Sequence, residues 1–244
     1  MLNLYAISKY HMARKKYLIV MAAGSGTRMG SELPKQFLSL EGKPVLRRTI
    51  EVFQEACEDI NVVTVLPQSH LDYWKDYCLK DNFTCPQVIV SGGFTRFHSV
   101  RNALDRIPDG CIVAVHDGVR PLVSASLVRE MMEKAENEAA IIPVVPCVDT
   151  MKVLASRDGR LVTVPGCSVD RSVLYGAQTP QVFHSELLKA AYALPYDTSF
   201  TDDASVVEKY GKSLSYVEGE RLNIKITTRE DLVLAEAVLS LRKS

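Results

Sequence analysis

The stretch from Tyr17 to Phe37 reads YLIVMAAGSGTRMGSELPKQF, and it decides how the rest of the chain can fold. It begins with an apolar run, Tyr17 to Met21, which is typical of a strand buried on both faces of a parallel sheet. Small residues follow, so the backbone can turn tightly at the carboxyl end of this strand, and consecutive N–H groups in such a turn form a concave anion site. The stretch predicts a triphosphate-binding loop built from Ala22, Ala23, Gly24, Ser25 and Gly26, with Arg28 and Lys35 beside it.

Two common phosphate-binding patterns do not fit this loop. A Walker A loop needs Gly-Lys-Ser/Thr after four intervening residues, but Met29 and Ser31 follow Gly24 and Gly26 at that distance. The dinucleotide pattern G-x-G-x-x-G needs glycine where Met29 stands, and Gly30 comes one residue late. A tight strand-to-helix connection without a ligand stays open as an alternative, although the basic residues beside the loop argue against it.

The composition narrows the class of protein. The 244 residues suffice for one large α/β domain with a substantial core. Lys plus Arg and Asp plus Glu number 29 each, so no overall field attracts nucleic acid or a membrane, and any anion site must be local. The six cysteines include no C-x-x-C pair, which disfavours a metal site or disulfide framework and predicts a cytoplasmic protein. No apolar run approaches the roughly 20 residues that span a bilayer.

The first sixteen residues differ from the rest of the chain. They carry basic residues and no acid, which faintly resembles a targeting peptide, but no hydrophobic segment or cleavage site is present. Translation can start at Met1 or at Met12. We therefore expect a disordered, non-functional extension over 1–16 and a single domain over 17–244.

Apolar periodicity predicts alternating strands and helices. Buried strands are expected over 17–21, 62–66, 88–90, 111–115 and 141–145, and a late strand near 217. Helices are expected over 45–56, 69–80, from about 96, over 124–138, from about 201 and over 228–242. This order predicts an α/β fold with a Rossmann-like, mostly parallel sheet, helices on both faces, and ligands at the carboxyl ends of the strands.

Two later strand ends carry residues suited to binding anions or cations. The third strand opens into GGFTRFHSV, where Gly92 and Gly93 permit close backbone approach, although such a pair is more often an ordinary turn. The fourth strand ends in HDGVRP, with Asp117 and Arg120 three residues apart. Because charged groups are rarely buried unpaired, these two residues either contact a ligand or form a salt bridge that fixes the loop.

The second half of the chain adds a hairpin and several polar segments. Alternating segments around an Asp-Gly turn predict a β-hairpin arm over about 147–171. The segment 175–181 has the composition of a loop, and Thr201 or Asp202 is expected to cap a helix. Lys225 stands between two isoleucines, so its side chain points away from theirs, toward a site or toward solvent.

Several of these strings together resemble a known family. AAGSGTRMG with PKQF, HDGVRP, DTMK, QTPQ, TDDA (TDEA in the family) and NIKIT resemble the motifs of the 2-C-methyl-D-erythritol 4-phosphate cytidylyltransferases, from about Tyr17 to the last helix. The resemblance implies transfer of CMP from CTP to this polyol phosphate, with release of pyrophosphate. It also implies a homodimer joined by the arm, and Mg²⁺ held mostly by phosphates, with Asp117 as the protein ligand.

The resemblance further assigns residues to roles. Three cations would be catalytic: Arg28, Lys35 and Lys225. The nucleotide would be bound by Ala22, Ala23, Gly24, Ser25, Gly26, Gly92, Gly93, Arg96 and Ser99. The acceptor would be bound by Asp117, Arg120, Thr150, Arg171, Thr179, Thr201 and Lys225, partly across the dimer interface. Some relatives carry an acidic residue where this chain has Phe94.

The reaction needs no activated nucleophile. A phosphate monoester is already anionic at neutral pH, and the motifs accordingly contain no nucleophile-base pair; what is needed is charge cancellation and in-line alignment. Two alternatives stay open. A ribitol 5-phosphate cytidylyltransferase shares most motifs but matches DTMK and the context of Arg171 less closely, and a non-catalytic nucleotide-binding module could have kept the loop.

Overall fold

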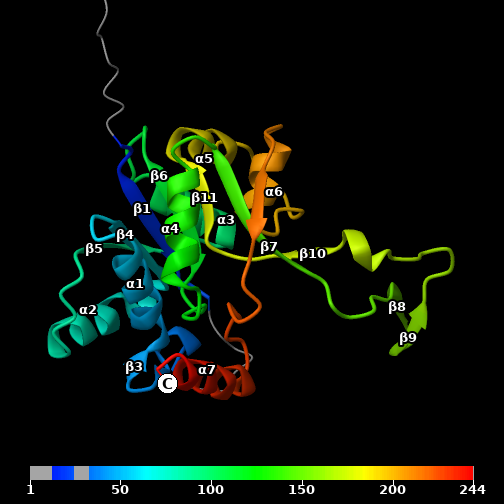
Figure 1. The fold of residues 1–244 in the computed structure, drawn as a ribbon, viewed down its shortest axis with the longest axis horizontal. Coiled ribbons are helices and arrows are strands. Elements are labelled where there is room, and N and C mark those ends of the chain that lie inside the picture. Colours follow the sequence, from blue (N-terminus) through cyan, green and yellow to red (C-terminus); the bar gives the residue numbers. More distant parts are fainter. Residues whose placement is uncertain (1–12, 25–32, 244) are drawn as a thin grey trace, which may run out of the picture.

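The structure is a computed structural model that describes residues 13–24 and 33–243 (Figure 1). Its centre is an eight-stranded mixed sheet with the order β10-β7-β11-β6-β1-β4-β5, in which β12 also pairs with β7. The strands are β1 Lys16–Met21, β4 Asn61–Leu66, β5 Gln87–Ser91, β6 Ile112–Asp117, β7 Ala140–Pro146, β10 Tyr175–Ala177, β11 Gln181–His184 and β12 Ser215–Glu218. The pairs β1–β4, β1–β6, β4–β5 and β7–β12 are parallel, which confirms the predicted mostly parallel sheet.

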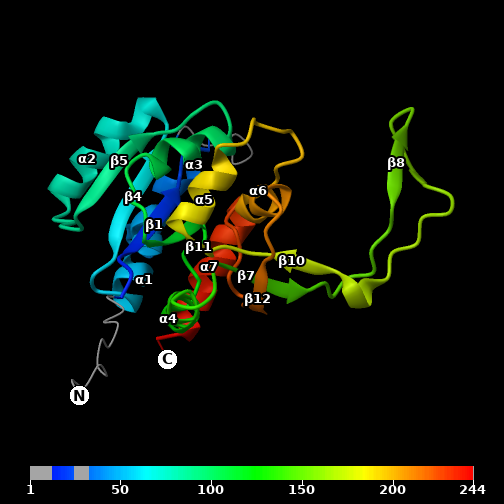
Figure 2. The same cartoon turned by 90° about the horizontal axis from the view of Figure 1, so that it is seen from above.

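Helices cover both faces of this sheet (Figure 2). They are α1 Val45–Ala56, α2 Leu71–Lys80, α3 Arg96–Leu104, α4 Ala125–Lys134, α5 Ser185–Tyr192, α6 Asp203–Lys209 and α7 Arg229–Leu241. Short 3₁₀ turns lie at η2 Lys35–Phe37, η3 Gln68–His70 and η4 Arg171–Val173, and a small pair β2 Ser39–Leu40 and β3 Lys43–Pro44 precedes α1.

Strand β1 explains why its sequence is continuously apolar. Leu18 and Val20 join the core formed with α1 and α4, whereas Ile19 joins the core formed with α3, α5 and α6. All three side chains are fully buried. Because successive residues of a strand point to opposite faces, a strand with helices on both sides needs apolar residues at every position.

The segment between β7 and β10 projects from the sheet as an arm (Figure 1). Its tip is the antiparallel pair of β8 Leu154–Arg157 and β9 Arg160–Thr163. The two residues between them, Asp158 and Gly159, both have positive φ, as a two-residue hairpin turn of the primed type I requires. The predicted β-hairpin is therefore present.

Some elements differ from the sequence prediction. The segment 175–181, expected as a loop, contains β10 and the first residue of β11. Strand β10 pairs antiparallel with β7, and β11 pairs antiparallel with both β6 and β7. Helix α5 was not predicted. Residues 1–12 of the expected extension lie outside the described residues, but Arg14 Nη1 pairs with Glu186 Oε1 at 2.7 Å and Lys16 begins β1, so the ordered chain begins before residue 17.

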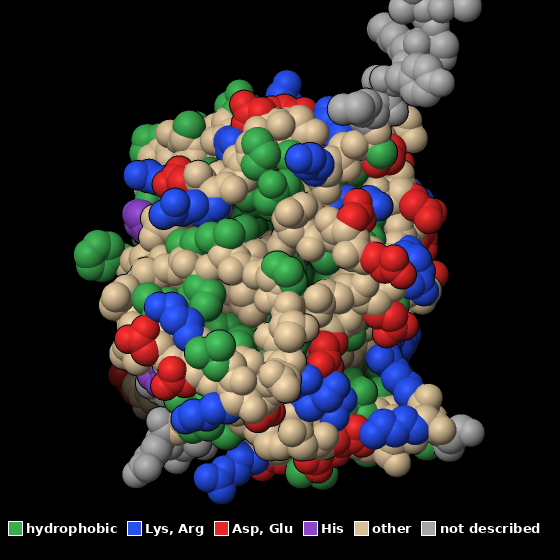
Figure 3. Space-filling model, turned by 90° about the vertical axis from the view of Figure 1, so that its left-hand side faces the viewer, with side chains coloured by type: hydrophobic (Ala, Val, Ile, Leu, Met, Phe, Trp, Pro, Cys, Tyr) green, Lys and Arg blue, Asp and Glu red, His purple; other side chains and the backbone are tan. Residues whose placement is uncertain are grey.

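The described surface agrees with the balanced charge of the sequence. On the face in Figure 3, basic and acidic side chains alternate rather than forming a continuous basic patch. None of the helices in the described ranges has both the length and the apolar character needed to cross a bilayer.

We expect Leu18→Ala to lower the free energy of unfolding by about 2 to 5 kcal/mol, because it leaves a cavity in a close-packed core. The matched control is Leu79→Ala on α2, where the side chain is 77% exposed, and its change should stay within about 0.5 kcal/mol. Urea unfolding followed by circular dichroism measures both. Equal effects for the two variants would contradict the two-sided burial of β1.

Candidate active site

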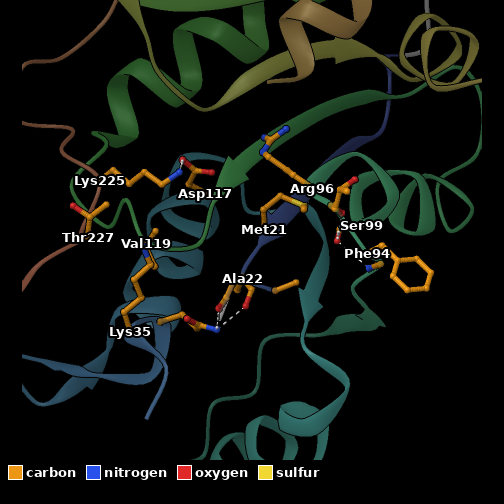
Figure 4. Close-up of a pocket in the computed structure, with 15 residues that line it drawn as sticks. Met21, Ala22, Lys35, Phe94, Arg96, Ser99, Asp117, Val119, Lys225 and Thr227 are labelled. Atoms are coloured by element: carbon orange, nitrogen blue, oxygen red, sulfur yellow. Dashed lines mark hydrogen bonds and ion pairs between the residues drawn. The ribbon is translucent and has the colours of Figure 1, made fainter. Parts of the chain in front are cut away.

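A cavity of about 500 Å³ lies at the carboxyl ends of β1, β5 and β6 (Figure 4). Its walls come from five separate parts of the chain: the end of β1, the η2 turn, the β5–α3 connection, the end of β6 with the loop after it, and the segment after β12. The lining residues are Met21, Ala22, Ala23, Gly24, Lys35, Gln36, Gly93, Phe94, Thr95, Arg96, Ser99, Asp117, Val119, Lys225 and Thr227. The cavity lies where the sequence analysis places the ligand, at the carboxyl edge of the parallel strands.

The cavity brings together many of the predicted site residues but not all of them. Nine of them line it: Ala22, Ala23, Gly24, Lys35, Gly93, Arg96, Ser99, Asp117 and Lys225. Ser25, Gly26 and Arg28 lie outside the described residues. The remaining six, Gly92, Arg120, Thr150, Arg171, Thr179 and Thr201, are not among the lining residues.

Asp117 is the electrostatic centre of the cavity. It ends β6, is 8% exposed, and its Oδ2 lies 3.0 Å from Lys225 Nζ and 3.2 Å from Arg120 Nε. Burial alone would raise the pKa of Asp117, but the charges of Lys225, Arg96 and Arg120 outweigh it and hold the pKa well below its usual range. Asp117 is therefore an anion that gathers cations from distant parts of the chain.

Arg120 and Thr179 stand behind Asp117. Arg120 also donates from Nη1 to the carbonyl oxygen of Asn223 at 2.8 Å, so its ion pair with Asp117 fixes the loop as the salt-bridge alternative expected. The backbone N–H of Asp117 donates to Thr179 Oγ1 at 3.1 Å, and Asn223 Nδ2 donates to the carbonyl oxygen of Thr179 at 2.9 Å. Direct contact of Arg120 or Thr179 with an acceptor stays a prediction.

Lys225 reaches the cavity as one of its two predicted orientations requires. The neighbouring Ile226 is fully buried against α7, while the ammonium group of Lys225 points to Asp117 in Figure 4. The segment is not a strand, so the alternation of side chains comes from an extended connection rather than from a sheet.

Gln36 is a site residue that the sequence analysis missed. Its side chain is 1% exposed, and Nε2 donates to the carbonyl oxygen of Ala22 at 2.7 Å and to that of Gly24 at 3.4 Å. Phe37 anchors the same turn by packing on the rings of His70 and Tyr73. Gln36 thereby joins the turn that carries Lys35 to the loop after β1, and its position next to Lys35 in PKQF was the available signal.

The β5–α3 connection is shaped by hydrogen bonds within itself. Ser99 Oγ accepts from the Gly93 N–H at 3.0 Å and donates to the carbonyl oxygen of Thr95 at 2.9 Å. Thr95 caps α3, and its hydroxyl also contacts His98 Nδ1 at 2.8 Å. These contacts give Ser99 a loop-shaping role beside its predicted contact with a nucleotide. Phe94 is fully exposed at the edge of the cavity.

Two glycines in this connection are required by close packing. A Cβ on Gly92 would lie 2.5 Å from the Cβ of Ala23, and one on Gly93 would lie 2.6 Å from the Cβ of His98. Both distances are shorter than side chains tolerate, so neither position can carry a side chain unless its neighbours move. Gly92 therefore acts through packing against the loop after β1.

Three predicted acceptor residues lie elsewhere in the single chain. Thr150 and Arg171 belong to the arm, where Arg171 Nη1 donates to the carbonyl oxygen of Val148 at 2.9 Å. Thr201 precedes α6, and the helix is capped by Asp202 with a reciprocal capping box to Ser205, which confirms the predicted N-cap. Within one chain, the cavity does not include these three residues.

The cavity suits a divalent cation that is held mainly by phosphates. Asp117 is the only carboxylate among the described residues that line it, and the described ranges contain no group of three His, Cys, Asp or Glu that could hold a metal. Mg²⁺ is commonly bound by one or two carboxylates together with substrate phosphates. The donor set therefore fits Mg²⁺ brought in by a nucleotide rather than a metal held in a protein cage.

Comparisons with known proteins agree with the geometry. The family model "2-C-methyl-D-erythritol 4-phosphate cytidylyltransferase" matches residues 17–241. The protein of this name from Phocaeicola vulgatus is 45% identical over 225 residues, which cover 92% of this chain and 99% of that protein. The solved structure of 4-diphosphocytidyl-2C-methyl-D-erythritol synthase from Anaerococcus prevotii is 28% identical, with a TM-score of 0.74 over 93% of this chain and 99% of that one. The cytidylyltransferase from Thermus thermophilus is 32% identical, with a TM-score of 0.70 and coverage of 93% and 99%.

We expect Asp117→Asn to lower the free energy of unfolding by about 3 kcal/mol at pH 7, because it leaves buried cations without their anion. Since the pKa of Asp117 is depressed in the folded protein, its contribution is complete above the unfolded pKa near 3.9 and is lost as the pH falls. The difference from the unaltered protein should stay constant from pH 8 to about 5 and narrow below about pH 4.

Urea unfolding at a series of pH values measures this difference. The control is Asp72→Asn, which removes the carboxylate of an exposed pair with Lys75 and should change stability by less than about 0.5 kcal/mol at every pH. A difference for Asp117→Asn that widened in acid would contradict the assignment.

Proposed function

The chain belongs to the 2-C-methyl-D-erythritol 4-phosphate cytidylyltransferase family, and from this we propose that it transfers CMP from CTP to 2-C-methyl-D-erythritol 4-phosphate. The products are 4-diphosphocytidyl-2-C-methyl-D-erythritol, an isoprenoid precursor of the non-mevalonate pathway, and pyrophosphate. The observation that carries the proposal is the convergence of the loop after β1, Lys35 and the Asp117–Lys225 pair on one cavity. A reducing cytoplasm is the compartment proposed, since all six cysteines are free.

The reaction is a displacement at the α-phosphorus of CTP. A phosphate oxygen of the acceptor forms the new bond to this phosphorus, and the bond to the oxygen that bridges the α- and β-phosphates breaks, so pyrophosphate leaves with the electron pair. The acceptor oxygen is already anionic, so the protein need not remove a proton. The barrier comes from bringing two anions together in line, and the protein lowers it by positioning and charge stabilisation.

The cations of the cavity divide this work. Backbone groups from Ala22 to Gly24 and the ammonium of Lys35 would bind the triphosphate, and Arg28, which lies outside the described residues, is assigned to the same task. Lys225 is directed to the acceptor phosphate, and its pair with Asp117 at 3.0 Å keeps the ammonium group in place before a ligand arrives. Charge is therefore gathered on the protein before the two substrates meet.

Mg²⁺ is the proposed cofactor, and Asp117 is its proposed protein ligand. When bound to the triphosphate, Mg²⁺ neutralises negative charge on the phosphate oxygens. Because Asp117 also holds Lys225 and Arg120, its carboxylate connects the nucleotide side of the cavity with the acceptor side.

The arm is the proposed contact between two subunits. It carries Thr150 and Arg171, and its apolar side chains are exposed in the single chain, among them Val148, Met151, Leu154, Leu161 and Val173. Exposed apolar groups on a projecting hairpin favour association with a second copy. In such a homodimer, the two polar residues complete the acceptor side of the partner's cavity.

An activity panel tests the function against its two alternatives. Purified protein with Mg²⁺ is given each of the four nucleoside triphosphates together with 2-C-methyl-D-erythritol 4-phosphate or ribitol 5-phosphate, and pyrophosphate release is measured. We expect release with CTP and the methylerythritol acceptor, its loss with excess EDTA, and its return with added Mg²⁺. Release with ribitol 5-phosphate alone would favour the ribitol enzyme, and CTP binding in calorimetry without release for either acceptor would favour a non-catalytic module.

Lys35→Ala and Arg28→Ala should each lower kcat by about 100- to 1000-fold, because each removes a preorganised cation from the transition state. Circular dichroism should show that both variants keep the fold. The matched control is Lys75→Ala, which removes an exposed lysine from α2 and should leave kcat unchanged. Near-normal turnover in Lys35→Ala or Arg28→Ala would refute the catalytic assignment of that residue.

Mixing two inactive variants tests the role of the arm. We expect Lys35→Ala and Arg171→Ala to be inactive separately but to recover about one quarter of normal activity when their subunits exchange, because half of the dimers are mixed and each has one intact site. Coupled pyrophosphate release after mixing measures the recovery. If Arg171 served the cavity of its own chain, each subunit of a mixed dimer would have a defective site and no activity would return.

A further inference from the structure

The carboxylate of Asp203 is fully buried beside the candidate active site. Its Oδ1 accepts hydrogen bonds from Arg96 Nη1 at 2.8 Å and from the hydroxyl of Tyr192 at 2.6 Å, and its Oδ2 accepts from Arg96 Nη2 at 2.5 Å. The arginine pair is therefore bidentate, the geometry in which a guanidinium is held most firmly. The three residues come from α6, α3 and α5, so one carboxylate joins three helices on the same face of the sheet.

The Arg96 side of the ion pair keeps its positive charge at any ordinary pH. Burial opposes the charge of Arg96, but Asp203 outweighs this and raises the pKa of Arg96 far above its usual value. Burial, reinforced by Asp203, raises the pKa of Tyr192, so its hydroxyl stays a donor. A buried pair of this kind is costly to break from one side, because the remaining charge is left without a partner.

Arg96 connects this buried pair with the cavity. Its side chain is 31% exposed and lines the cavity beside Phe94, Thr95 and Ser99. It is also one of the three cations that hold the pKa of Asp117 down, so its charge is within electrostatic reach of that carboxylate. Asp203 occupies both Nη atoms of Arg96, while Asp117 pairs with Lys225 and Arg120.

The start of α6 also contacts the segment that contains Thr179, on the acceptor side of the cavity. Asp202, which precedes Asp203, accepts a hydrogen bond from Gln181 Nε2 at 2.7 Å, and Gln181 Oε1 accepts from the N–H of Ala204 at 2.8 Å. Gln181 lies two residues after Thr179, whose hydroxyl accepts from the N–H of Asp117. The same helix start therefore contacts the nucleotide side through α3 and the acceptor side through the 179–181 segment.

We propose that Asp203 is a positioning residue for the proposed cytidylyl transfer: it orients Arg96 in the nucleotide half of the cavity and couples that half to the acceptor half through the start of α6. Asp203 itself touches neither substrate. This inference rests on the proposed function, and it adds a residue that acts through Arg96 rather than on the reacting atoms.

Asp203→Asn tests the inference because it keeps the shape of the side chain and removes its charge. We expect the KM for CTP to rise about tenfold and kcat/KM to fall about 100-fold, with a rise in the KM of the acceptor as well. Asp203→Glu keeps the charge, and the family's TDEA motif carries Glu here, so this variant should return to within about fivefold of normal. If Asp203→Asn lost activity and Asp203→Glu did not restore it, the positioning role would be overturned.

A second variant approaches the same contact from the cavity. Arg96→Lys keeps the positive charge but cannot form the bidentate pair, and it should raise the KM for CTP to a similar extent. The double variant of Asp203→Asn and Arg96→Lys should be no worse than the poorer single variant, because both act through one contact. If the losses of the two single variants multiplied in the double variant, the coupling between Asp203 and Arg96 would be overturned. If Asp203→Asn folds poorly, the same comparison is made with Asp203→Glu combined with Arg96→Lys.

A control variant and a measurement on the unaltered protein distinguish a failure of the positioning role from a failure of the proposed function. Glu186→Gln breaks another arginine-carboxylate pair, with Arg14 at 2.7 Å, outside the cavity, so it should lower the melting temperature while leaving both KM values within about twofold. If Asp203→Asn behaved in the same way, Asp203 would be merely structural. If the unaltered protein bound CTP but released no pyrophosphate, the proposed function would fail, whereas the CTP Kd of Asp203→Asn would still decide whether Asp203 positions Arg96.

Discussion

The buried carboxylate of Asp117 is the constraint on which the cavity depends. Cations held close together repel one another, and the repulsion grows when water is excluded. Here Lys225 and Arg120 share one carboxylate oxygen, and Arg96 is within its field. The three cations come from parts of the chain more than twenty residues apart, so the anion at the end of β6 determines where those parts meet. A site for two polyanions is thus assembled before either arrives.

Much of the fold could be predicted from local sequence patterns, because short stretches of sequence show where its central strands and helices lie. The apolar runs at β1, β4 and β6 require burial on both faces, and the reciprocal cap of Thr228 and Asp231 marks the start of α7. Strands β10 and β11 were not recognisable in this way, because they are only three and four residues long and pair with β7, a strand that lies much earlier in the chain. A run of three or four residues is too short to show the periodicity that marks a longer strand.

The same distinction separates the site residues that were predicted from those that were missed. Lys35, Asp117 and Lys225 stand in recognisable strings, and the fold brings them to one cavity. Gln36 and Asp203 are buried polar residues whose roles depend on a distant hydrogen-bond partner. The partner is Ala22, 14 residues away, for Gln36, and Arg96, 107 residues away, for Asp203. No local pattern reports such a partner. Thr150, Arg171 and Thr201 stand in strings that resemble family motifs, but they lie outside the cavity of the single chain. A motif does not show which cavity, or which copy of the chain, a residue serves.

The contact between Gly92 and Ala23 limits which substitutions this wall of the cavity accepts. The two residues face each other across neighbouring loops, and a methyl group added at Gly92 would lie 2.5 Å from the one already present at Ala23. A side chain at position 92 therefore requires the two loops to move apart, and its Cβ would also lie 3.2 Å from Ser99 Oγ. Because Ala23 lines the cavity, any such shift would also change the shape of the cavity wall.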